Sequence, residues 1–131
     1  MTNPRGSATV EFVLLTPVLV LLVVFVAAIG RSVDVSMSVR RAAEDAARAA
    51  SMVSHGKMAS TGRNRVMSEL SRETGCLHPR AVVDLGKRGE SRFVTVTASC
   101  DLNRVGVSSL FPFGHTFTSV STEIVDVFTF R

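Results

Sequence analysis

The feature that most constrains this chain is an apolar run over residues 12–29, which contains no charged side chain. At about 18 residues it approaches the roughly 20 that a helix needs to cross the hydrocarbon core of a bilayer. The run therefore predicts a membrane-spanning helix. The remainder of the 131 residues is enough for one small domain.

Two other interpretations of this run remain open. A secretory signal peptide would end at a small-residue cleavage site, and Val26-Ala27-Ala28 could serve as one. However, the run is long for that role, and no turn-forming break precedes Val26. The second alternative is an uncleaved single-pass anchor that holds a binding module.

Composition and motifs argue against several classes of function. The net charge is +4, but the 15 basic residues are scattered, and there is no Trp or Tyr to interleave with them. We therefore expect no nucleic-acid partner. The sequence carries no nucleophile, phosphate-loop or zinc-protease motif, so we expect no enzyme activity and no small-molecule substrate. The three histidines are far apart, and neither a metal site nor a cofactor is predicted.

A helical pattern continues past the apolar run. Apolar or small residues recur every three to four positions as far as Val53. We predict one helix over residues 8–53, about 70 Å long, with a modest kink at Pro17. The small side chains of its second half would let it pack closely on the chain's own domain, and part of that stripe could also contact other copies.

A second helix is predicted over residues 60–74. Gly56 is expected to follow the first helix as its C′ residue, and Gly75 to stop the second. The apolar side of the second helix would consist of Val66, Met67 and Leu70.

Beyond Pro79 the apolar period falls to two, which is typical of strands. The clearest strand spans residues 92–100, and one of its faces would carry Val94, Val96, Ala98 and Cys100. Other strands are expected at residues 81–85, 105–110 and 116–130, with a polar turn at 86–90, a loop holding Phe111 and Phe113, and an irregularity near Asp126. The predicted fold is α+β, with a small antiparallel sheet packed on the long helix.

The two cysteines, Cys76 and Cys100, both follow the apolar run. If this part of the chain is exported, a disulfide is allowed, and we expect it to join the sheet to the end of the second helix. In the chain-entropy model, closing a loop of about 25 residues stabilises the fold by roughly 3–4 kcal/mol. Two buried free thiols are the alternative.

Glu11 stands at the N-terminal edge of the apolar run. A charged side chain in the middle of a membrane helix costs about 2.5–3.5 kcal/mol on insertion scales, and less near the edge. If the chain were cut after Gly6, Ser7 would supply a free amine four residues before Glu11. That amine could neutralise Glu11 of the same chain or of a neighbouring subunit. Without the cut, Glu11 would be an interfacial acid that reaches the headgroups.

The segment Arg5-Gly6-Ser7-Ala8-Thr9-Val10-Glu11-Phe12-Val13-Leu14-Leu15-Thr16-Pro17 resembles the leader of type IV pilins and pseudopilins, and more narrowly that of the TadE-like proteins of the bacterial Tad (Flp) pilus system. The resemblance implies that a membrane prepilin peptidase cuts between Gly6 and Ser7. Glu11 and Phe12 would then be the fifth and sixth mature residues. It also implies other Tad pilus subunits as partners.

These observations predict four parts: a leader at 1–6, a transmembrane helix at 7–30, its extension at 31–53 and a small extracytoplasmic domain at 54–131. Arg5 favours a cytoplasmic N-terminus, although Arg31, Arg40 and Arg41 on the other flank leave orientation undecided by charge alone. The predicted function is that of a membrane-anchored minor pilin or pseudopilin in the bacterial cell membrane. The alternative is an anchored or secreted extracytoplasmic binding module.

Overall fold

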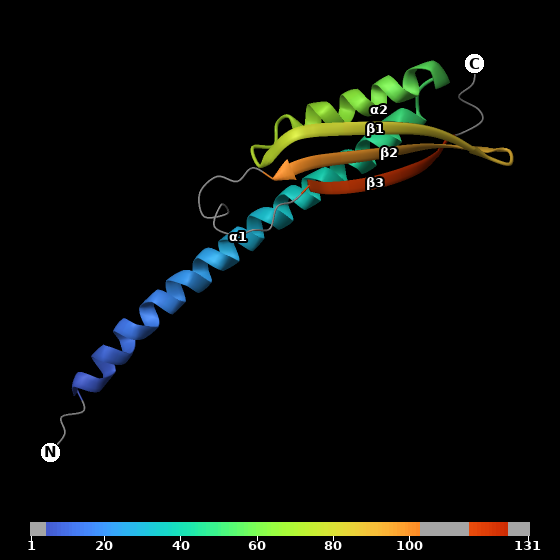
Figure 1. Ribbon diagram of the computed structural model, residues 1–131. Helices are drawn as coiled ribbons and strands as arrows, with labels where there is room; N and C mark the ends of the chain where they lie inside the picture. Colours follow the sequence, from blue (N-terminus) through green and yellow to red (C-terminus); the bar gives the residue numbers. More distant parts are fainter. Residues whose placement is uncertain (1–4, 103–115, 126–131) are drawn as a thin grey trace.

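The computed structural model describes residues 5–102 and 116–125, which form two helices and one sheet. The elements are α1 (Arg5–Ser51), α2 (His55–Leu70), β1 (Cys76–Arg88), β2 (Ser91–Leu102) and β3 (Thr116–Val125). The N-terminal half of α1 extends away from the other elements, whereas its C-terminal half and α2 lie against the sheet (Figure 1). The predicted α+β architecture is confirmed.

Helix α1 begins and ends within three residues of the predicted bounds and continues through Pro17. Its second half is buried at the spacing that the sequence indicated, because one side of the helix faces the sheet and α2. This side is made of small residues that allow close approach, so the prediction that the stripe packs on the chain's own domain is confirmed. The buried residues are Val35, Val39, Ala42, Ala43, Ala46, Ala47 and Ala50.

Helix α2 starts earlier than predicted, and Gly56 lies in its first turn rather than after α1. Ser54 is the N-cap residue, with an extended backbone, and its carbonyl accepts a hydrogen bond from the Lys57 N–H at 2.8 Å. His55 and Gly56 are poor helix formers, so the sequence indicated a later start. Packing outweighs this local preference. The buried side consists of Met58, Gly62, Val66 and Leu70, whereas Met67, which was expected there, is exposed.

Gly75 does not stop α2, which already ends at Leu70. It instead lets the turn after α2 approach α1, because a Cβ at this position would lie 2.6 Å from Cγ2 of Val35. Val35 is β-branched and sits in a helix, so its side chain has little freedom to move aside. Close approach to α1 therefore requires glycine here.

We expect Gly75→Ala to lower the free energy of unfolding by about 1–3 kcal/mol, the usual range for overpacking a buried site. Chemical denaturation in detergent, followed by circular dichroism, measures this. Gly56→Ala is the matched control, because a Cβ there meets nothing within 4 Å and alanine favours the helix. A Gly75→Ala variant as stable as the Gly56→Ala protein would contradict the role of the close contact.

The sheet is an antiparallel meander in the order β1-β2-β3. The β1–β2 hairpin closes at Arg88 and Ser91 through a two-residue turn in which Gly89 has a φ of 63°, as a Gly at the first central position of a type II′ turn would. The predicted turn at 86–90 was too long, because 86–88 belong to β1. The predicted buried face of β2 is confirmed: Val94, Val96, Ala98 and Cys100 are at most 1% exposed.

One face of the sheet is covered by the two helices, and the other face is open (Figure 1). α1 packs on β2 and β3, α2 packs mainly on β1, and both helices lie on the same face. On the open face, Val82, Val120 and Ile124 are exposed, and the hydroxyls of Thr95 and Thr122 are hydrogen-bonded at 3.0 Å. The predicted strand at 105–110, the loop with Phe111 and Phe113, and the irregularity near Asp126 lie outside the described residues.

Candidate functional site

The motif residues all lie on the N-terminal part of α1. The helix begins at Arg5, so the peptide bond between Gly6 and Ser7 lies in its first turn. Ser7 and Glu11 are four positions apart, which places them on the same face and about 6 Å apart along the axis. A cation at Ser7 would thus stand one turn from the carboxylate of Glu11.

Glu11 is exposed and forms no ion pair with any residue in the ranges 9–102 and 116–125, whose side chains the structure describes. The described part of the domain is too far along α1 to supply a cation, because the first buried residue of the helix is Val35, about 36 Å along the axis from Glu11. A counter-charge for Glu11 must therefore come from the helix start, from lipid or from another molecule. Phe12 beside it is 74% exposed, so this end of the helix presents an acid next to a large apolar ring.

No residue of the apolar segment that follows is buried in the described structure. Its most apolar 18-residue window has a mean hydropathy of 3.1, and none of that window is buried. Exposed large apolar side chains lie on all sides of the helix, at residues 12–15, 18–23, 25, 26 and 29. A helix that is apolar all round requires an apolar surrounding, and this one is long enough to cross a membrane.

Pro17 lies inside this segment and cannot donate a hydrogen bond to the carbonyl of Val13. One position earlier, the hydroxyl of Thr16 donates to the carbonyl of Phe12 at 2.7 Å. This bond goes to the carbonyl next to the one that Pro17 leaves without a donor, so it does not replace the missing hydrogen bond to Val13. Helix α1 continues through Pro17 without a break, and the kink there stays a prediction.

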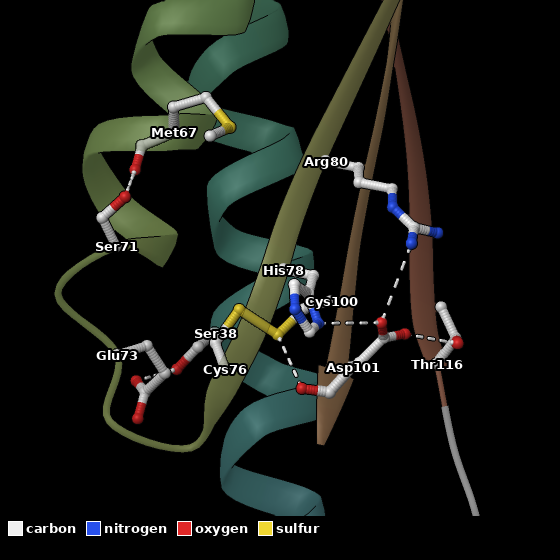
Figure 2. Close-up of a disulfide and its surroundings, with 10 residues drawn as sticks. All are labelled: Ser38, Met67, Ser71, Glu73, Cys76, His78, Arg80, Cys100, Asp101 and Thr116. Carbon is white, nitrogen blue, oxygen red and sulfur yellow. Dashed lines mark hydrogen bonds and ion pairs between the residues drawn. A yellow bond between two sulfur atoms is a disulfide. The ribbon is translucent and has the colours of Figure 1, made fainter. Parts of the chain in front are cut away.

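Cys76 and Cys100 form a disulfide at the end of the domain where α1 leaves it (Figure 2). The predicted pairing of these two cysteines is confirmed. The prediction was wrong only in the element that carries Cys76, which is the first residue of β1 rather than the end of the second helix. The bridge therefore joins neighbouring strands, since Cys76 pairs with Leu102, two positions beyond Cys100. It lies against the core, where Cys100 is 1% exposed.

Around this disulfide, polar contacts tie three strands and α1 together. The Asp101 carboxylate accepts a hydrogen bond from Thr116 at 2.6 Å and lies 3.7 Å from His78 and 3.9 Å from Arg80 (Figure 2). His78 has a φ of 50° at an irregularity in the β1–β2 pairing. The cluster has no signature in the sequence, because its members come together through the shift in β1–β2 register.

One further contact holds the turn after α2 against α1. The hydroxyl of Ser38 donates to a carboxylate oxygen of Glu73 at 2.9 Å, close to the contact between Gly75 and Val35. The second half of α1 is therefore fixed to the domain by both packing and a hydrogen bond.

The surface also has an open groove of about 680 Å³ between α1 and α2, lined by Asp45, Arg48, Asn64 and Arg65 among others. Glu69 lies 3.7 Å from Arg65, so one of these cations already has a partner. No cluster of three or more His, Cys, Asp or Glu side chains suited to a metal ion occurs in the part of the chain that the structure describes.

A comparison with protein families bears out the resemblance seen in the sequence. The family model described as TadE-like protein matches residues 6–48, which include the motif, the apolar segment and most of the buried half of α1. No curated protein matches the chain, and no solved structure matches it. The match thus covers most of α1. Helix α2 and the sheet lie outside the matched residues and are described from the structure alone.

Proposed function

We propose that this TadE-like protein is a membrane-anchored minor pilin or pseudopilin that assists the assembly of a Tad (Flp) type IV pilus. The observation that carries the proposal is the continuity of α1. One helix contains the matched motif, an apolar segment of which no residue is buried, and a C-terminal half that packs into the core of the domain. The match to the family model and the exposed apolar helix both support membrane anchoring.

The finer steps of the proposal concern the start of the helix. A prepilin peptidase would cut after Gly6 and leave Ser7 with a free amine one turn before Glu11. The carboxylate without an ion pair among the described residues supports a role for that amine, because a buried charge needs a partner and such pairs fix register. Other Tad pilus subunits would supply the neighbouring helices.

The orientation that we propose places the N-terminus in the cytoplasm and the domain outside it. The disulfide supports this orientation, because disulfides persist in oxidising compartments and are rare in the cytosol. The competing function is a single-pass anchored or secreted binding module, in which the sheet or the groove would receive an extracytoplasmic ligand.

The N-terminal sequence of the mature protein, isolated from its native membranes, tests the proposal. We expect the chain to start at Ser7, which is the product of prepilin-type processing. A start near Ile29 would mean a released domain and would favour the secreted binding module. An intact Met1, or Thr2 after removal of Met1, would contradict processing and leave an ordinary anchor.

A further inference from the structure

Helix α1 passes through two environments with a short stretch between them. As far as Ile29 it is apolar and has no buried residue, and from Val35 onward one side of it is buried in the domain. Between these parts, residues 30–34 are exposed except for the half-buried Ser32. Ser32 and Val33 line a pocket with Phe117 of β3, but no residue of this stretch is buried in the domain.

Apart from the position of Pro17 in the apolar segment, this stretch contains the interior residue of α1 with the weakest local preference for helix, Gly30. A Cβ at Gly30 would meet nothing within 4 Å, so packing does not require glycine at this position. Glycine in a helix interior lowers the preference for the helical conformation about fivefold relative to alanine. Two residues later, the hydroxyl of Ser32 donates to the carbonyl of Ala28 at 3.2 Å, a contact that tends to bend helices.

We propose that the turn of α1 at Gly30–Ser32 is a hinge between the membrane helix and the domain. Sharp bends in helices occur at glycine and serine pairs of this kind. The domain side of the hinge is stiff, because Ser38 and Val35 are fixed to the turn after α2. The domain would therefore tilt as a body while the apolar segment stays in the bilayer. This inference rests on membrane anchoring and not on the pilin role.

Distances between spin labels on the two arms test the hinge in the full-length protein in lipid nanodiscs. One label is placed in the membrane helix at Leu22→Cys, which lies between Pro17 and the hinge so that a kink at Pro17 does not affect the distance. The second label is placed at Asn64→Cys on α2 or at Thr118→Cys on the open face of the sheet. The native cysteines are joined in a disulfide and take no label. Because the second labels lie on opposite sides of the domain, a tilt that shortens one distance lengthens the other.

We expect both distance distributions to be broad in the parent protein. In the Gly30→Ala/Ser32→Ala variant they should be at least about twofold narrower, because alanine restores the local helical preference. Gly56→Ala is the matched control, since a Cβ there also meets nothing within 4 Å but the site is far from the junction. Its distributions should equal those of the parent.

Two outcomes would overturn the hinge. Parent distributions already as narrow as those of the double variant would show a rigid junction. Equal narrowing in the Gly56→Ala control would show that general helix stabilisation, and not this turn, sets the width. A start of the mature chain other than Ser7 would refute processing without affecting either measurement, provided that the apolar segment is retained.

Discussion

Glu11→Ala is expected to reduce incorporation of the protein into pilus assemblies about ten- to hundredfold while leaving it in the membrane. The estimate corresponds to the loss of a hydrogen bond to a charged group, about 1.5–3 kcal/mol. Insertion should not suffer, because removing a carboxylate from the edge of an apolar helix lowers the cost of burial in lipid. The structure supports the first effect, because Glu11 has no ion pair within the described residues.

The measurement is an immunoblot of sheared fibre and membrane fractions from cells that carry the Tad pilus system. Glu11→Gln separates charge from hydrogen bonding, and we expect it to fall between the parent and alanine. Asp34→Ala is the matched control, because Asp34 is an exposed acid on the same helix beyond the apolar segment. Unchanged incorporation of the alanine variant would remove the pairing argument, and loss from the membrane fraction would assign Glu11 to anchoring.

The parts of this fold that the sequence predicts are those in which one side chain type repeats with a fixed period. The buried half of α1 repeats every three to four residues from Val35 to Ala50, and the buried face of β2 alternates from Val94 to Cys100. Both patterns are produced by burial of one side of a regular element, so they can be read without knowing its neighbours. The motif before the apolar segment is equally accessible, because its residues are consecutive.

The errors arose where tertiary contacts outweigh local preference. Helix α2 begins with His55 and Gly56, which are poor helix formers. The prediction that Val66 and Leu70 are buried is confirmed, whereas the burial of Met58 and Gly62 becomes evident only when α1 and the sheet are in place. Gly75 resembles a helix stop, yet the space that it leaves is filled by Val35 from another helix. Such roles depend on distances between elements, which no local pattern contains.

The surroundings of the disulfide were missed for a related reason. The sequence indicated that Cys100 lies on the buried face of a strand, which is correct, but it misplaced Cys76 because the start of β1 was expected later. The contacts of Asp101 with His78, Arg80 and Thr116 join three strands across a shift in register. A register shift is a property of strand pairing and has no signature in either strand alone.

Removing the disulfide by Cys76→Ala/Cys100→Ala is expected to lower the free energy of unfolding by about 3–4 kcal/mol. The two cysteines are 24 positions apart, and an open loop of this size gives the unfolded chain more conformations. Because small domains are stable by only about 5–15 kcal/mol in total, this loss is a large fraction. Alanine is preferred to serine, because a hydroxyl at the buried Cys100 would add its own cost.

Denaturant titration in detergent measures this change, and the parent protein treated with reductant is the control for effects of the substitutions themselves. Both samples should unfold at the same, lower denaturant concentration. A loss below about 1 kcal/mol would show that other contacts hold this end of the domain without the bridge. The ion pairs of Asp101 would not be enough, since an exposed pair contributes only about 0–1 kcal/mol. The disulfide would then matter little to stability, and the close contact of Gly75 with Val35 would be the main constraint where α1 leaves the domain.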